Sequence, residues 1–389
     1  MKNLRQYLYS LSTLPSALFS ALWFGLLSLP FTGLPGALYI AGAIIVIYAL
    51  FRYLPKLLLL PPIILQQFPA LVLRLKPISS LKPKALGDLG FFVLLIAVIL
   101  LPFFTSPYVV DIAALAGIYI ILSLGLNIMV GYTGLLNLGF AGFYAIGAYS
   151  YALLNTRLGM GFWESLPLSM VLSALAGILI GIPALRLRGD YLAIVTLGFG
   201  EITRIVLNNW VTLTNGPNGI TGIERPYIGS FELKGVTEYY YLVLLFVFLT
   251  ALFIKKTIHS KAGRTWMAIR DDEIASTAMG INTFLYKLYA FSFGALWAGL
   301  AGQLFSAKMR FVSPESFTFF ESVLIVAMVI LGGQGTLLGP AIGAIILVAL
   351  PELLREFQQY RMVFLGAGLI FMSIFRPQGI IGRRSTGSR

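Results

Sequence analysis

Long runs of apolar residues set the strongest limit on what this chain can fold into. An α-helix needs about 20 mostly apolar residues to cross the hydrocarbon core of a bilayer. Such runs occur near 14–31, 36–54, 87–104, 111–130, 135–155, 166–185, 191–210, 238–256, 285–307, 318–332, 336–351 and 361–375. Glycines at 332–335 interrupt the segment 318–351, so its halves can be two short or re-entrant helices. We expect an all-α integral membrane protein, a polytopic bundle of about 10–12 transmembrane or re-entrant helices.

The composition excludes an ordinary soluble enzyme. The chain of 389 residues is 58% hydrophobic and 11% charged, whereas soluble domains carry roughly a quarter charged residues. It has no cysteine and one histidine, His259, which excludes disulfides, thiolate nucleophiles and Cys-ligated metals. No G-x-x-x-x-G-K-[ST] phosphate loop is present, so any ATP must be handled by a partner protein.

The basic residues predict how the helices are oriented. The net charge is +13, and an N-terminus in the cytoplasm places 20 of the 28 Lys and Arg residues on the cytoplasmic side. Such an excess is typical of cytoplasmic loops, so we expect both termini to be cytoplasmic. The basic residues stand between apolar runs and are not gathered in one patch or arm, so we expect a lipid bilayer, and no nucleic acid, as their partner.

The apolar runs and the charge pattern divide the chain into four parts. Residues 1–54 form an N-terminal transmembrane hairpin, and residues 55–84, rich in proline and lysine, form a basic cytoplasmic linker. The main membrane domain covers 85–382, and a basic tail covers 383–389. Within the main domain, the polar segment 257–286 is expected to be a cytoplasmic loop.

Small residues recur at helical spacing in two of the predicted spans. The two sets are Gly139, Ala141, Gly142, Ala145 and Ala148, and Gly294, Ala295, Ala298, Gly299, Ala301, Gly302 and Ser306. Close helix packing is the favoured interpretation, and a translocation path beside the same face is the alternative. The glycine turn at 131–134 is echoed by the one at 332–335, as in transporter folds with internal repeats.

Two ionisable residues stand inside a predicted span. Charged side chains are unfavourable in lipid and are therefore functional candidates. Glu201 and Arg204 are three residues apart on one predicted helix, close enough to form an ion pair. Mutual neutralisation facing the bundle interior is the favoured interpretation, and a direct role in the substrate path is the alternative.

The cytoplasmic loop contains a candidate docking helix. Asp271, Asp272 and Glu273 suit the first turn of a short helix, where carboxylates meet the positive end of the helix dipole. Gly280 suits its C-terminal cap, and Ala275 contributes to a slim body that can enter a groove of another protein. An ordinary solvated loop is an alternative. A Mg²⁺ site of a membrane enzyme is disfavoured, because consecutive carboxylates point to different faces of a helix.

Several ordered motifs resemble the LivM-type permease subunits of bacterial high-affinity branched-chain amino acid ABC transporters. These motifs are GLNIMVG (125–131), GFYAIGAY (142–149), LRLRGDYLAIVTLGFGEI (185–202), GPNGI (216–220), DEIA (272–275), SPESFTF (313–319) and RPQG (376–379). The resemblance covers roughly 85–382, and the N-terminal hairpin is similar only in architecture to an extension found in some members. The resemblance implies a permease domain of the ABC importer type.

The resemblance also implies a set of partners. Such an importer combines this subunit with a second related permease, two cytoplasmic ATPase subunits and a periplasmic binding protein that delivers leucine, isoleucine or valine. ATP and Mg²⁺ would be bound by the ATPases, so this chain would bind no cofactor and would not itself be an enzyme. It would reside in the bacterial inner membrane. A related importer for urea or short amides is the alternative substrate class.

Two sites follow from the resemblance. In such importers a cytoplasmic helix of the permease, often marked by E-A-A-x-x-x-G, docks into a groove of the ATPase. Here Arg270, Asp271, Asp272, Glu273, Ala275 and Gly280 correspond to that region, with Ile274 in place of the first Ala and one extra residue before the glycine. The polar external segment 211–237 is either a surface for the binding protein, through Asn215, Pro217 and Asn218, or an ordinary surface loop.

Overall fold

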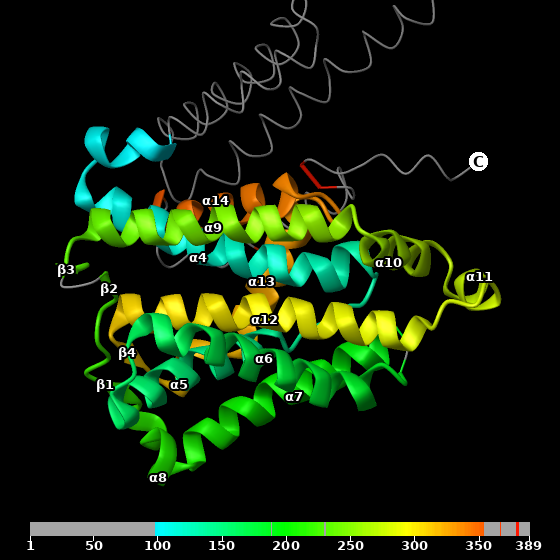
Figure 1. Cartoon of the computed structure of the whole chain (residues 1–389), viewed down its shortest axis with the longest axis horizontal. Helices are drawn as coiled ribbons and strands as arrows, with labels where there is room; N and C mark the ends of the chain where they lie inside the picture. Colours follow the sequence, from blue (N-terminus) through cyan, green and yellow to red (C-terminus); the bar gives the residue numbers. More distant parts are fainter. Residues whose placement is uncertain (1–97, 188, 229–230, 354–365, 367–378, 381–389) are drawn as a thin grey trace, which may run out of the picture. The chain divides into compact units, whose positions relative to one another are not determined.

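The computed structural model describes residues 98–187, 189–228, 231–353, 366 and 379–380 (Figure 1). The chain divides into two compact units, Met1–Asp88 and Leu89–Arg389, and the described residues all belong to the second. The expected hairpin 1–54, the linker 55–84, the apolar run 361–375 and the tail 383–389 lie outside the described residues, so their structure stays a prediction.

Helices make up most of the described chain. They are α4 Pro107–Asn127, η3 Ile128–Tyr132, α5 Phe140–Leu158, α6 Phe162–Ala184, α7 Asp190–Asn209, α8 Val211–Thr214, η4 Gly216–Asn218, α9 Val236–Ile258, α10 Lys261–Asp271, α11 Glu273–Ala278, α12 Thr283–Met309, η5 Pro314–Phe317, α13 Phe319–Gly332 and α14 Leu338–Leu353. Four two-residue strands form two antiparallel pairs: β1 Ile220–Thr221 with β4 Phe311–Val312, and β2 Tyr227–Ile228 with β3 Phe231–Glu232.

The predicted helical membrane fold is confirmed. Within the described residues, five helices are long and apolar enough to cross a membrane, namely α4 continued by η3, α6, α9, α12 and η5 continued by α13. The helix α14 is apolar but shorter. The chain is therefore a multi-pass membrane protein. The segment 318–351 forms two separate helices, α13 and α14, that end and begin around the glycines at 332–335.

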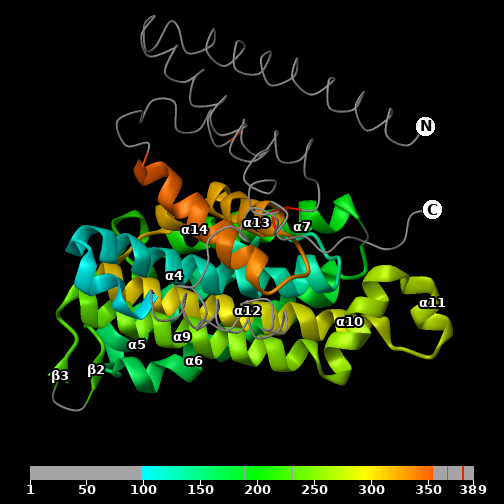
Figure 2. The same ribbon diagram turned by 90° about the horizontal axis from the view of Figure 1, so that it is seen from above.

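The bundle has two distinct ends. Figures 1 and 2 show the hairpin of β2 and β3 at one end and helices α10 and α11 at the other. Helices α4, α9 and α12 run between these ends (Figure 1). The segment around 211–237 and the loop around 257–286 therefore lie at opposite ends of the molecule, where a spanning bundle meets different compartments.

The runs of small residues serve helix packing. A Cβ on Gly147 of α5 would lie 2.5 Å from the Cα of Gly299 on α12, and a Cβ on Gly302 would lie 2.5 Å from the backbone nitrogen of Ala148. Only glycine permits the two backbones to approach this closely. We call the contact of Gly147 with Gly299 and of Gly302 with Ala148 the glycine seam. The packing interpretation of these residues is confirmed.

The two glycine turns meet in space. Asn127 of α4 donates through Nδ2 to the carbonyl of Thr336 at 2.8 Å, and its Oδ1 accepts from the backbone nitrogen of Gly335 at 3.0 Å. A Cβ on Gly131 would lie 2.5 Å from that nitrogen. Since α4 with η3 has 26 residues, it is roughly 39 Å long, long enough to cross a bilayer. The turn at 332–335 therefore lies at the same depth as the end of η3, where a helix long enough to cross the membrane ends.

Candidate functional site

Asp272 caps the N-terminal end of the short helix α11. This residue has an extended backbone, with φ −155° and ψ 108°, and its side chain accepts a hydrogen bond from Ala275 N at 2.9 Å. Aspartate is a favoured N-cap because its carboxylate satisfies an amide that the helix leaves unpaired. The expectation that Asp271 also belongs to the first turn is wrong. Asp271 is the last residue of α10, since the extended Asp272 separates the two helices.

The three consecutive acids therefore do not converge. Glu273 opens α11 and forms a 2.6 Å ion pair with the buried Lys287 of α12. Asp272 is used as the cap, and Asp271 belongs to another helix. In the part of the chain that the structure describes, no three His, Cys, Asp or Glu side chains are grouped as a metal site would require. The Mg²⁺ interpretation of these acids finds no geometric support.

The C-terminal end of α11 depends on Gly280. Gly280 donates to the carbonyl of Thr277 at 3.0 Å, and Ile281 donates to that of Ser276 at 3.1 Å. This pair of bonds is the Schellman motif, which needs a left-handed residue after the helix, and Gly280 has φ +80°. The predicted cap position is confirmed. The helix is thus closed by hydrogen bonds at both of its ends.

The tip around α11 exposes large apolar side chains. Ile274 is 77% exposed and Met279 is 82% exposed. Ile274 lies in α11 and Met279 directly follows it, and Figure 2 shows α11 at the end of the bundle where α10 also lies. Large apolar side chains exposed on a polar, structured tip fit a contact with another protein. The geometry therefore fits a helix that is presented to a partner.

Arg270 lies between the two glycine turns. Its Nη1 donates to the carbonyl of Gly131, and the same nitrogen would lie 2.6 Å from a Cβ on Gly335. Its Cγ packs at 3.3 Å from the Cβ position of Gly134, where φ is +74°. We predicted Arg270 as part of the docking region. The structure places its guanidinium on the turns of the membrane domain, where it connects α10 to the ends of η3 and α13.

Two further contacts hold α10 and α11 on the bundle. The fully buried Trp266 of α10 donates from Nε1 to the carbonyl of Tyr286 at 2.9 Å. The ion pair of Lys287 with Glu273 joins α12 to α11. The sequence interpretation missed Trp266, Lys287 and Asn127. Only Trp266 gave a sequence signal, as a large aromatic residue within an otherwise polar loop.

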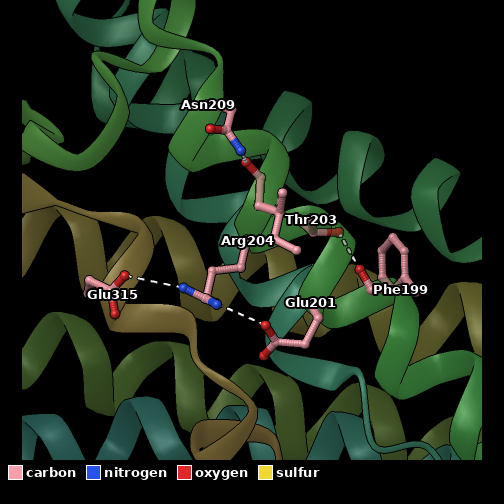
Figure 3. A network of polar contacts seen from close by, with 7 residues as sticks. Phe199, Glu201, Thr203, Arg204, Asn209 and Glu315 are labelled. Carbon is pink, nitrogen blue, oxygen red and sulfur yellow. Dashed lines mark hydrogen bonds and ion pairs between the residues drawn. The ribbon is translucent and has the colours of Figure 1, made fainter.

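The predicted pair of Glu201 and Arg204 forms part of a larger network (Figure 3). Arg204 Nε lies 3.0 Å from Glu201 Oε2, and Arg204 Nη1 lies 3.2 Å from Glu315 Oε1. We call these three residues the Arg204 cluster. Their side chains are 30%, 26% and 67% exposed for Glu201, Arg204 and Glu315. The pair was expected to face the bundle interior, but the structure places it at the edge of the packed face of α7.

Helix α7 has a packed face and an exposed face. Its buried residues are Leu192, Ala193 and Thr196. We call the opposite side the α7 stripe, which consists of Tyr191, Ile194, Val195, Ile202, Ile205 and Val206, all exposed. Glu201 and Ile205 are one turn apart and so share a side of the helix. The Arg204 cluster thus borders an apolar surface that is exposed among the described residues.

The segment predicted to meet a binding protein is compact. Asn215 has φ +65°, and its Nδ2 donates to the carbonyl of Gly219 at 3.0 Å, so it shapes the turn. Pro217 and Asn218 in η4 are exposed. Ile220 pairs with Val312 in the β1–β4 ladder, which ties this segment to the chain after α12. Asn215 is exposed as well, so an external protein can reach all three of the predicted contacts.

Comparison with known proteins identifies the family. The profile of the family described as the branched-chain amino acid transport system, permease component, matches residues 108–373. This chain belongs to that permease family. The matched region contains nearly every element described above, including the α11 tip, the α7 stripe and the segment around Pro217.

Curated relatives agree with the family match. The permease is 46% identical over 326 residues to the high-affinity branched-chain amino acid transport system permease protein LivM of Salmonella typhimurium, which covers 78% of this chain and 76% of the relative. The LivM protein of Escherichia coli gives the same values. A probable LivM of Methanocaldococcus jannaschii is 25% identical, over 68% of this chain and 90% of the relative. No solved structure matches the permease.

These comparisons confirm the resemblance drawn from the motifs and the expected class of membrane transport permeases. They do not assign roles to single residues. The roles of the α11 tip, the Arg204 cluster and the segment around Pro217 therefore rest on the geometry described above.

Proposed function

We propose that this permease is the membrane-spanning subunit of an ABC importer that moves leucine, isoleucine and valine into the cytoplasm. The observation that carries the proposal is the 46% identity, over 78% of the chain, to LivM proteins named for high-affinity branched-chain amino acid transport. The sequence contains no phosphate-binding loop, so ATP and Mg²⁺ are assigned to partner ATPase subunits.

The ATPase is assigned to the α11 tip. The helix is capped at both ends by Asp272 and Gly280, so it keeps its shape without a partner. Ile274 and Met279 offer apolar anchors on its surface, and burial of apolar surface is the main favourable term in most protein associations. A displacement of α11 would be carried by Arg270 to the glycine turns at 131–134 and 332–335.

A second, related permease is assigned to the α7 stripe. Exposed apolar residues such as Ile194 and Ile202 are compatible with lipid or with protein. The Arg204 cluster at their border is not compatible with lipid, because ionised groups in transmembrane segments face a protein interior or a water-filled cavity. A neighbouring subunit on this side would remove the cluster from lipid.

The binding protein is assigned to the opposite end of the bundle. Pro217 and Asn218 are exposed there, on a segment held by the β1–β4 ladder. The excess of basic residues on the side of the α10–α11 loop supports a cytoplasmic position for that loop and a periplasmic position for the Pro217 segment. This orientation belongs to a protein of the bacterial inner membrane with both termini in the cytoplasm.

The test combines purification with uptake. The tagged chain, isolated in mild detergent, should recover two ATPase polypeptides and a second permease, identified by mass spectrometry. Cells that depend on the complex should take up radiolabelled leucine, isoleucine and valine, and each should compete with the others. Uptake of urea or acetamide in place of leucine would refute the substrate assignment. Full transport by the chain purified alone would refute the ABC assignment.

A further inference from the structure

We propose that the Arg204 cluster of Glu201, Arg204 and Glu315 binds the charged head group of the amino acid during its passage through the permease. The proposal rests on the proposed function for the identity of the cargo. The ligand chemistry is that of an α-amino acid zwitterion, whose ammonium and carboxylate groups both lose water in an apolar passage. Loss of that water is unfavourable unless charged or polar partners replace it.

The charge of the cluster exceeds what a structural ion pair needs. Glu201 and Arg204 alone would neutralise each other across one turn of α7. Glu315 approaches from a different element, η5, and leaves the cluster with one surplus negative charge. Figure 3 shows Arg204 between the two carboxylates. A surplus carboxylate beside a membrane-spanning helix is unfavourable in the absence of a cationic partner, and a substrate ammonium is such a partner.

The cluster also retains unused hydrogen-bonding groups. Within the part of the chain that the structure describes, Arg204 donates through Nε and Nη1, and its Nη2 donates no hydrogen bond. Glu201 and Glu315 each use one carboxylate oxygen in these contacts. A guanidinium edge binds a carboxylate through two parallel hydrogen bonds, and a carboxylate oxygen accepts from an ammonium. The open donors and acceptors are thus complementary to both ends of a zwitterion.

The surface beside the cluster suits a branched aliphatic side chain. Ile205 stands one turn beyond Glu201 on the same side of α7, and Ile202 follows Glu201 directly. Both isoleucines are exposed in this chain. The passage would run between this permease and the second permease assigned to the same side, so a substrate whose head group contacts Arg204 can lay its side chain along the α7 stripe. The charged cluster would recognise amino acids in general, and the stripe would favour apolar ones.

The substrate would replace Glu315 as a partner of Arg204, and this exchange suits a weak site on a transport path better than a tight binding site. A substrate carboxylate competes with Glu315 for Arg204 Nη1, which already carries a hydrogen bond. The gain in binding is therefore a difference between two similar contacts. A site on a transport path has to bind well enough for the substrate to enter and weakly enough for it to leave. Glu315 is exposed, so it is the residue of the cluster that can release Arg204 when the substrate carboxylate binds.

The test uses the complete complex in proteoliposomes, with ATPase subunits and leucine-loaded binding protein. We expect Arg204→Gln to lower the initial rate of leucine uptake at least about tenfold, the effect of losing a hydrogen bond between charged groups. ATPase association and ATP hydrolysis stimulated by the binding protein should persist. Asp111→Asn, which breaks a 2.5 Å ion pair between α4 and Lys308 of α12, is the matched control and should leave uptake unchanged.

A double variant separates binding from structure. Glu201→Gln combined with Arg204→Gln replaces the pair by two neutral amides of similar size, so a purely structural pair would be relieved and uptake restored. Head-group binding predicts that uptake stays low in this variant and also falls in Glu315→Gln, whose side chain is largely exposed. Restored uptake in the double variant, or normal uptake in Arg204→Gln, would overturn the proposal. Failure of the wild-type complex to carry leucine would instead refute the proposed function.

Discussion

Replacing Gly280 by arginine tests the docking tip with little disturbance of the fold. Gly280 has φ +80°, and no atom lies within 4 Å of a Cβ built on it. An arginine there meets no collision, but the left-handed backbone costs about 1–2 kcal/mol for a residue with a Cβ. Domains are stable by about 5–15 kcal/mol. We therefore expect Gly280→Arg to insert into the membrane in normal amounts.

The effect on the ATPase should be much larger. The new side chain would project beside Met279 at the tip where the partner is expected to bind. Disturbing the centre of a protein interface costs about 2–4 kcal/mol, which weakens binding roughly 30- to 700-fold. Copurification of the ATPase should be lost, and leucine uptake should fall to background at an unchanged amount of permease in the membrane.

A matched control exists at the other end of the bundle. Gly159 follows α5 as its C-cap, has φ +64°, and also has no atom within 4 Å of its Cβ position. Gly159→Arg therefore carries the same backbone penalty and the same new charge away from α11, and it should transport normally. Normal uptake and ATPase copurification in Gly280→Arg would refute the docking assignment. An equal loss in both variants would show that backbone strain is the cause.

Three other substitutions test separate contacts. Arg270→Ala removes the hydrogen bond to Gly131. The ATPase should still bind, but the amount of leucine taken up per ATP hydrolysed should fall severalfold. An unchanged ratio of uptake to hydrolysis would contradict a role of Arg270 in coupling α10 to the glycine turns. Gly147→Leu drives a side chain into the backbone of Gly299 and should destabilise the permease by more than the usual 1–3 kcal/mol of overpacking, measured as a lower melting temperature in detergent. Asp272→Asn keeps an effective helix cap and should transport normally, whereas Asp272→Ala should weaken α11 by about 1 kcal/mol; abolished transport in the Asn variant would favour a metal-binding carboxylate.

The membrane helices could be predicted from the sequence because the bilayer imposes one dominant requirement on them. The predicted run 238–256 corresponds to α9 at Val236–Ile258, and the run 285–307 to α12 at Thr283–Met309. Each is a continuous apolar stretch bounded by polar residues. The division between α10 and α11 was not predicted, because it depends on one extended residue, Asp272, whose carboxylate can either cap a helix or lie within its first turn.

The candidate sites could be predicted only where their residues are neighbours in the chain. Glu201 and Arg204 are separated by one helical turn, and their ion pair forms. Glu315 is 111 residues away from Arg204, and nothing in a local pattern indicates that contact. The two glycine turns were noticed as an echo in the sequence, yet their meeting requires Asn127 and Arg270, which are brought together by the fold.

The glycine seam limits how this permease can change shape. Where Gly147 meets Gly299 and Gly302 meets Ala148, backbone touches backbone, and there are no flexible side chains to rearrange during sliding. A shift of one residue along either helix would bring a methyl group against the opposing main chain. Helices α5 and α12 are therefore expected to stay fixed relative to each other. Motion that opens and closes the passage must come from parts held by side-chain contacts, such as α10 and α11, which Trp266, Arg270 and the ion pair of Glu273 with Lys287 hold on the bundle.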